Sequence, residues 1–463
     1  MRAILARSGG KTVVIAWSSS AALPTRCTLP RMLLSIQNSP MRYSWGATGA
    51  ISEVMGAGAG LIEPETDNPK QAELWFGAHR GSPSRIAADG GDTSSTAESA
   101  PTLRDFIAEN PQRALGSLAA GLRPGDEPRL PFLMKVLAAS EPLSLQAHPR
   151  LDDAIAGFAA ENERGVPLDA PNRNYRDASH KPELLIALTE TMDALAGFRV
   201  HAEVLELVRC IAEFAAENLA FQEFARRVAQ ATTDRDTLDL VAWLLSDDDT
   251  VHDAVTALDR WLATAAAPGA ERYQRERCNL QRIRQAFPED SGCLTALLMN
   301  HVSVKRGEAI YIQAGILHAY LQGVGIEVMA ASDNVLRGGL TPKHIDVPEL
   351  LRILRVTPTP PPFLAPLQLA EGVQLFKPNE PDFQVQRVAG ETLEAQVRFV
   401  GPAILLALEG ELTVTGATGA RAVLGQGDAL YVTPDEAPLE IAGAGDCVVA
   451  SVGVDAETTL PLS

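Results

Sequence analysis

The stretch from Gly307 to Lys343 constrains the fold of this chain more than any other. It opens with Gly-Glu, an apolar run rich in β-forming residues (309–312) and a Gln-Ala-Gly turn. His318 follows three residues after Gly315 of the turn, at the start of a second β-like run. The pattern predicts two strands joined by a tight turn. A single histidine beside an apolar run is commonly a core residue, so the role of His318 depends on what surrounds it.

A polar, glycine-rich loop follows this predicted pair of strands. Glu327 lies on the mostly apolar second strand, and the loop 332–343 carries Arg337 and Lys343. Arginine presents a planar fork of donors that suits an oxyanion, whereas lysine offers a compact charge suited to a phosphate. The loop therefore indicates a site for an anionic ligand. A solvated surface loop with two cations is the plainer alternative.

A row of polar residues lies in the segment LPFLMKVLAASEPLSLQAHP, at 130–149. Residues 143–148 alternate like a strand, so Ser144, Gln146 and His148 project from one face. A polar row that faces the inside of a β-structure is costly unless a partner satisfies it. A metal ion would be such a partner.

The segment YRDASHKPE adds a carboxylate. Lys181 and Glu183 again occupy alternate positions, which makes Glu183 a candidate metal ligand. His180 and Lys181 fit solvated positions equally well.

The remaining regions organise the chain around these motifs. Apolar residues recur at helical spacing from about 200 to 290, which predicts helices without chemistry of their own. A proline-rich linker, 357–362, precedes a strand-rich part in which GDALYV (427–432) repeats the pattern of GEAIYI (307–312). Pro438 stands where His318 stands in the first copy, so the second copy is expected to lack a metal ligand.

Composition limits the classes of function. The net charge is −18 and no basic stretch interrupts it, which argues against nucleic acid as a partner. Five cysteines without a CxxC pair fit a reducing compartment and argue against a cysteine zinc site. No apolar run is long enough for a membrane helix. Residues 1–31 contain no acidic residue in an otherwise acidic chain, so we expect them to be a non-native or disordered extension.

Four separated motifs, in order, resemble those of the type I phosphomannose isomerases, which are zinc-dependent cupin enzymes. The motifs are AELWFGAH, PLSLQAHP, HKPE and GILHAYLQG…SDNVLRGGLTPK. The resemblance runs from about Ser35 to the C-terminus. Small departures from the family pattern occur, such as Arg80-Gly81 where a proline is common, but no metal ligand is lost.

The resemblance implies a fold, a cofactor and a location. The family binds one zinc ion through residues that fall on Gln146, His148, Glu183 and His318, and its active-site arginine falls on Arg337. The expected fold is mainly β, with two cupin-type jelly-roll barrels and an inserted α-helical domain. The expected domains are a catalytic cupin domain (32–199 and 291–355), the helical insertion (200–290) and a degenerate C-terminal cupin domain (356–463). A cytoplasmic monomer that acts on a small phosphosugar, without a membrane partner, is also implied.

The implied reaction interconverts mannose 6-phosphate and fructose 6-phosphate, a step toward GDP-mannose. A proton moves between C1 and C2 through an enediol, and a cationic donor or Lewis acid stabilises the charge on the oxygens. Proton transfer requires an acid–base group, for which Glu327 is the candidate, while Lys181 is suited to polarise an oxygen. Residues expected to bind the substrate are Lys343, Ser144 and Trp45.

Two other functions remain open at this point. A cupin oxygenase would use non-haem iron, for which Gln146 is a weak ligand. A non-catalytic sugar-binding cupin would have no use for Arg337 and Lys343 beside the metal.

Overall fold

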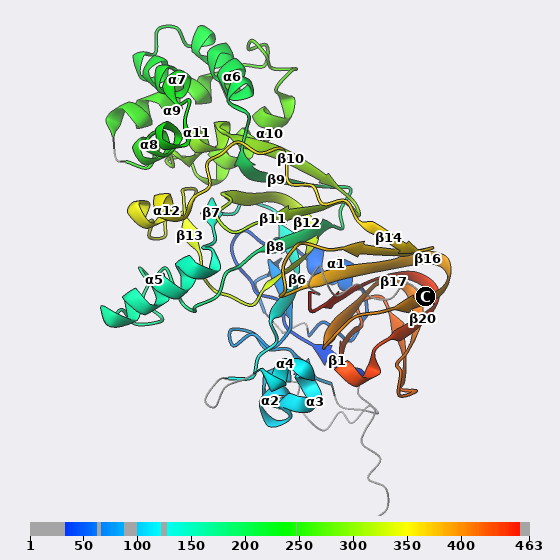
Figure 1. The fold of residues 1–463 in the computed structure, drawn as a ribbon. Coiled ribbons are helices and arrows are strands. Elements are labelled where there is room, and N and C mark those ends of the chain that lie inside the picture. Colours follow the sequence, from blue (N-terminus) through cyan, green and yellow to red (C-terminus); the bar gives the residue numbers. More distant parts are fainter. Residues whose placement is uncertain (1–32, 63–65, 88–99, 122–126, 247, 454–463) are drawn as a thin grey trace, which may run out of the picture. The chain divides into compact units, whose positions relative to one another are not determined.

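The computed structural model describes residues 33–62, 66–87, 100–121, 127–246 and 248–453, and Figure 1 shows their fold. The extension expected at 1–31 lies outside the described residues. The structure is mostly β with several helices. None of the helices in the described ranges has the length and apolar character needed to cross a bilayer.

The first large sheet contains the motifs of the middle of the chain. Its strands are β4 (Glu73–Phe76), β6 (Phe132–Ala139), β7 (Gln146–Ala147), β8 (Glu183–Ala187), β9 (Thr191–Phe198), β10 (Met299–Lys305), β11 (Ala309–Ile312), β12 (His318–Ala330) and β13 (Leu336–Arg337). The long strand β12 organises this sheet. Its first residues pair with β7 and β9, and its later residues pair with β6 and β8.

The second large sheet gathers the C-terminal strands. Its members are β1 (Leu33–Gln37), β5 (Arg85–Ile86), β14 (Leu367–Ala370), β15 (Val373–Phe376), β16 (Gln384–Val397), β17 (Ala403–Thr415), β18 (Arg421–Gly425), β19 (Ala429–Val432) and β20 (Leu439–Ser451). Strand β1 pairs with β19, so this sheet takes strands from the segment expected to belong to the first domain. A separate pair joins β2 (Ala47–Thr48) and β3 (Lys70–Gln71).

Six helices follow one another between β9 and β10, and Figure 1 shows them gathered in one cluster. They are α6 (His201–Phe214), α7 (Leu219–Gln230), α8 (Asp234–Leu244), α9 (Asp249–Ala263), α10 (Gln274–Ala286) and α11 (Gly292–Leu297). The apolar stripe of α6 that the sequence predicts, from Val204 to Ile211, is buried. Strands β9 and β10 pair directly with each other on either side of this segment.

Further helices occur elsewhere in the described residues. These are α1 (Ala50–Met55), α2 (Leu103–Glu109), α3 (Pro111–Leu115), α4 (Ser117–Ala120), α5 (Leu151–Glu163), α12 (Val347–Ile353) and a 3₁₀ turn, η2 (Pro434–Glu436). Helix α2 begins with a capping box between Thr102 and Asp105, which satisfies backbone donors at its first turn.

The repeated sequence pattern folds in the same way twice. The turns before β11 and β19 place Gly307 and Gly427 at φ 81° and 84°, a conformation that favours glycine. In each turn the acidic residue that follows accepts a hydrogen bond from a backbone N–H three residues earlier, at 3.0 Å for Glu308 and 2.8 Å for Asp428. The next strand begins at His318 in the first copy and just after Pro438 in the second.

One apolar core joins the two large sheets. Its buried side chains come from strands of both sheets and include Ile36, Phe76, Phe132, Ile186, Val324, Phe376, Ile404 and Tyr431. The sheets therefore depend on each other for the burial of their apolar faces.

Candidate active site

Three buried side chains converge at the start of β12. His148 Nε2 lies 3.0 Å from Glu183 Oε1, and His318 Nε2 lies 3.2 Å from Glu183 Oε2. All three residues are at most 1% exposed. Their candidate ligand atoms lie within 4.8 Å of one another, a spacing that a single metal ion would bridge.

The protonation of the two rings can be read from their other contacts. His148 Nδ1 lies 2.7 Å from the carbonyl oxygen of Asn334, and His318 Nδ1 lies 3.0 Å from that of Ile316. A carbonyl oxygen only accepts, so in both rings Nδ1 carries the proton and a neutral ring has a bare Nε2. Burial, followed by the charge of Lys181, lowers the pKa of His148 to about 4, which keeps its ring neutral.

Two bare nitrogens therefore point at one carboxylate in a buried place. Neither Nε2 atom has a hydrogen-bond donor among the described residues, and the same holds for Glu183 Oε2. Lone pairs and a negative charge repel each other at such distances unless a cation lies between them. The donor set, two imidazole nitrogens and a carboxylate, fits zinc.

Strand pairing places two further predicted residues beside this group. Gln146 of β7 is directly opposite His318 of β12 and also directly opposite Arg337 of β13. Residues directly opposite each other in adjacent strands share a face of the sheet. Arg337, Gln146 and His318 therefore form one row on the face that carries the metal candidates.

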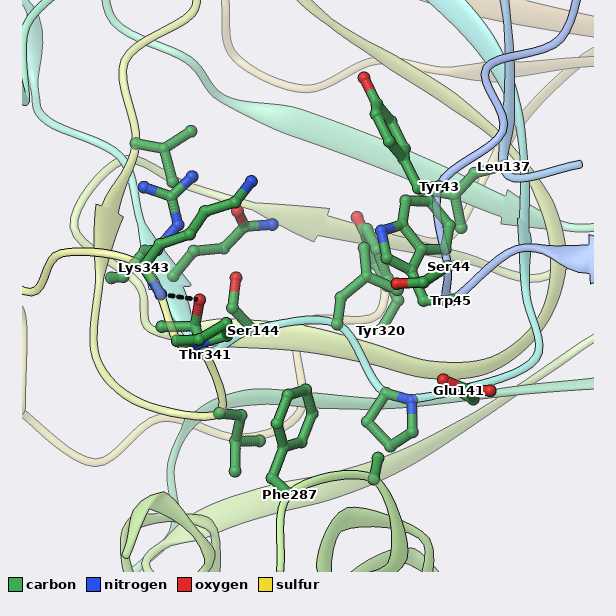
Figure 2. A pocket seen from close by; sticks show the side chains of 18 of the residues that line it. Tyr43, Ser44, Trp45, Leu137, Glu141, Ser144, Phe287, Tyr320, Thr341 and Lys343 are labelled. Atoms are coloured by element: carbon green, nitrogen blue, oxygen red, sulfur yellow. Dashed lines mark hydrogen bonds between the residues drawn. The ribbon is translucent and has the colours of Figure 1, made fainter. Parts of the chain in front are cut away.

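A cavity of about 1030 Å³ opens above this row. Predicted site residues that line it are Trp45, Ser144, Gln146, Lys181, Glu183, Glu327, Arg337 and Lys343. Figure 2 shows Ser144, Thr341 and Lys343 on one side of it and the rings of Tyr43, Trp45 and Tyr320 on the other. The structure thus brings the predicted substrate-binding and catalytic residues to one cavity, with His148 and His318 buried beside it.

The predicted acid–base residues lie deep in this cavity. Lys181 Nζ is 2.9 Å from Glu183 Oε1. Burial would raise the pKa of Glu183, but the charge of Lys181 holds it well below its usual range. Burial, together with the charge of Glu183, raises the pKa of Glu327 to about 8.

Lys135 is a site residue that the sequence analysis missed. Its Nζ lies 3.6 Å from Glu73 Oε1 and 3.7 Å from Glu327 Oε2, and 4.7 Å above the ring of Trp75. Strand pairing sets Lys135 directly opposite both Trp75 and Glu327. The signal in the sequence was a lysine inside the apolar run of β6, which is costly without a buried partner.

Arg176 is a second missed residue. Burial, followed by the charge of Arg176, lowers the pKa of Arg337. Burial and the charges of both arginines lower the pKa of Lys343. The three cations therefore lie near one another. Among the described residues none of the three forms a salt bridge with a carboxylate. Such an uncompensated group of cations in an acidic chain suits an anionic ligand.

The helical segment also contributes to this cavity. Figure 2 shows Phe287, just beyond α10, at its edge. Asp290 accepts a hydrogen bond from the backbone N–H of Thr341 at 3.0 Å, and Thr341 Oγ1 accepts one from the N–H of Lys343 at 3.1 Å. The helical segment, which the sequence analysis expected to have no chemistry of its own, thus holds in place the loop that carries Lys343.

Comparison with known proteins identifies a single family. A model of the phosphomannose isomerase type I catalytic domain matches residues 33–201. The mannose-6-phosphate isomerase of Salmonella typhimurium is 37% identical over 416 residues, which cover 88% of this chain and 96% of the relative. The mannose-6-phosphate isomerase of Homo sapiens is 33% identical over 414 residues, which cover 85% and 92%.

Solved structures agree with the sequence comparison. A crystal structure of mannose 6-phosphate isomerase bound with zinc and yttrium matches with a TM-score of 0.77 at 33% identity. The match covers 91% of this chain and 100% of that chain. A variant of phosphomannose isomerase from Salmonella typhimurium matches with a TM-score of 0.78, the same identity and the same coverage.

Proposed function

The chain belongs to the type I phosphomannose isomerase family, and from this premise we propose which of its residues carry out the reaction. Its activity is that of a mannose-6-phosphate isomerase, which interconverts mannose 6-phosphate and fructose 6-phosphate with zinc as cofactor. The observation that carries the site assignment is the convergence of two bare imidazole nitrogens on Glu183 beside the cavity that Arg337 and Lys343 line.

His148, Glu183 and His318, completed by Gln146, are the residues that would hold the zinc ion. Gln146 is included because it is the residue directly opposite His318. Three neutral ligands and one carboxylate leave the ion a net positive charge. Zinc bound there would supply a Lewis acid that polarises a substrate oxygen.

The cations beside this group bind the phosphosugar. Lys343 and Arg176 are assigned to the phosphate, because no carboxylate of the described residues neutralises them. Arg337 shares a row with Gln146, so it is assigned to the O1/O2 end, where negative charge develops. Ser144 and Trp45 also line the cavity, and they are assigned to contact the sugar.

Proton transfer between C1 and C2 is assigned to the buried acidic and basic side chains. Glu327 takes and returns the proton through an enediol, since a carboxyl whose pKa is about 8 exchanges a proton readily near neutral pH. Lys135 contacts Glu327 and balances its charge. Lys181 donates a hydrogen bond to a substrate oxygen from its position beside Glu183.

The architecture that supports this site is assigned as two cupin-type jelly-roll barrels. The matching turns before β11 and β19 support a repeated barrel motif. The helical insertion (200–290) is supported by the direct pairing of β9 with β10. Strands β1 and β5 of the catalytic domain (32–199 and 291–355) then belong to the sheet of the C-terminal domain (356–463). The C-terminal domain has no histidine at the position equivalent to His318. The protein acts as a cytoplasmic monomer.

An assay with metal removal tests the function. Purified protein with one zinc per chain is expected to convert mannose 6-phosphate to fructose 6-phosphate. Treatment with a chelator should abolish the conversion, and added zinc should restore it. Full activity in protein shown to contain no metal would overturn the assignment of the zinc site.

A further inference from the structure

The ring of His180 faces the C-terminal sheet, although the next residue, Lys181, lies in the cavity. His180 Nε2 lies 2.7 Å from Asp382 Oδ2, and Nδ1 lies 3.9 Å from Glu380 Oε2. Both carboxylates belong to the segment between β15 and β16. Each nitrogen of the ring therefore has an acidic neighbour from the second sheet.

The carboxylates are held from the other side as well. The hydroxyl of Tyr311, on β11, donates a hydrogen bond to Glu380. Tyr311 is directly opposite Leu184 of β8, the strand that begins with Glu183. The polar atoms of the cluster formed by His180, Glu380 and Asp382 thus pair with one another and with Tyr311, so the cluster requires no bound ion.

The residue before His180 is fixed by a different part of the chain. The carbonyl oxygen of Ser179 accepts hydrogen bonds from Ser332 Oγ at 3.1 Å and from Asn334 Nδ2 at 2.8 Å. Anchors at 179 and 180 hold the short segment that leads to Lys181. Lys181 Nζ then reaches Glu183 Oε1 at 2.9 Å, at the wall of the cavity.

We propose that His180 is a positioning residue for the isomerase reaction, and that Asp382 and Glu380 hold its imidazolium so that Lys181 stays at the substrate. The proposal rests on the proposed function of Lys181. It gives the C-terminal sheet a part in the reaction, although this sheet has a proline where the first has His318.

The charge of His180 depends on these carboxylates. Burial lowers the pKa of His180, but the hydrogen bond and charge of Asp382 and the charge of Glu380 raise it above its ordinary value. The charged groups that face the ring are Asp382 and Glu380, and Tyr311 is bonded to Glu380. Without the charge of Asp382 the ring loses its proton at a lower pH.

The test compares variants of Asp382 in zinc-loaded protein. Asp382→Asn is expected to lower kcat for mannose 6-phosphate about tenfold, because a small displacement of a catalytic group slows the reaction. KM, bound zinc and Tm should stay near their original values, and the alkaline limb of the kcat profile should move to lower pH. Asp382→Glu should recover most of the activity. Glu371→Gln, which removes an exposed carboxylate on the turn before β15, is the matched control.

The possible outcomes separate this proposal from the proposed function. If the unaltered zinc-loaded protein does not interconvert the two phosphosugars, the function itself is wrong. If it does, and Asp382→Asn and His180→Ala both keep its kcat and pH profile, the positioning role is overturned. A lower Tm with unchanged kcat would also overturn it, since the cluster would then be only a structural contact.

Discussion

At the scale of single residues, His318 has one ring nitrogen committed to a backbone carbonyl and the other directed at Glu183. His318→Ala removes one of the candidate ligands without altering the partners of His148. We expect this variant to lose most of its bound zinc and its activity, measured by elemental analysis and by the isomerase assay. His344→Ala, which changes an exposed histidine, should keep about one zinc per chain. Full zinc content in His318→Ala would remove this residue from the ligand set.

Arg337 gives a second prediction at this scale. The proposed role needs the planar fork of the guanidinium as well as its charge, so lysine is a poor substitute. Arg337→Lys is expected to keep fold and zinc while kcat falls roughly a hundredfold, the scale of losing one oxyanion donor. Steady-state kinetics check this, with Arg421→Lys on the exposed strand β18 as control. A rise in KM alone would instead make Arg337 a binding group for substrate and transition state alike.

The sequence predicted the candidate site residues unevenly. Ser144, Gln146 and His148 became candidates because alternation places them on one face, and that inference needs only local spacing. Lys135 and Arg176 were missed because their roles depend on partners far along the chain. Lys135 contacts Glu73 and Glu327 only because strand pairing places β4 and β12 on either side of β6.

At the scale of elements, helices α10 and α11 are tied to β10 through His301. Its Nε2 donates to the carbonyl oxygen of Ala296 at 3.1 Å, and its Nδ1 accepts from Asn279 at 3.4 Å. The bond that Nδ1 accepts requires a neutral ring, because Nδ1 of a protonated ring carries a hydrogen. Burial above all lowers the pKa of His301 to about 4.

The low pKa of His301 predicts a pH-dependent stability. The unfolded chain binds the proton near pH 6.5 and the folded chain only near 4, so the stabilisation is complete above 6.5 and declines as pH falls. Between pH 7.5 and 5 we expect a loss of about 2 kcal/mol in the free energy of unfolding from this group. Urea unfolding at both pH values should show that loss reduced in His301→Gln, but unchanged in His344→Gln. Equal losses in all three proteins would contradict the prediction.

Periodicity predicted the helices better than it predicted their contribution to the cavity. The apolar stripe of α6 follows from its spacing and is buried. The contact of Asp290 with the loop at Thr341 could not be foreseen, because it joins residues that have no periodic relation. The short strand β7 covers only Gln146 and Ala147 of the longer run that alternates.

At the scale of the whole molecule, the two large sheets share one apolar core. A chain that ends at 355 would lack Phe376, Ile404 and Tyr431, and the side chains that pack against them in this core would be exposed. Removing one large buried apolar side chain costs about 2–5 kcal/mol, whereas the free energy of unfolding of a whole protein is only about 5–15 kcal/mol. We therefore expect the shortened chain to be insoluble or unfolded by circular dichroism. A cooperatively folded, zinc-binding product would show that the first sheet is stable alone.

The pairing of β1 with β19 has a consequence for biosynthesis. Leu33 pairs with Val432, so β1 is synthesised long before the strand with which it pairs. Contacts between residues this distant in the chain form slowly, since a long loop must close before they contribute. Until β19 leaves the ribosome, β1 has an unpaired edge and an exposed apolar face. The yield of active enzyme in the cell should therefore depend on chaperones that bind nascent chains.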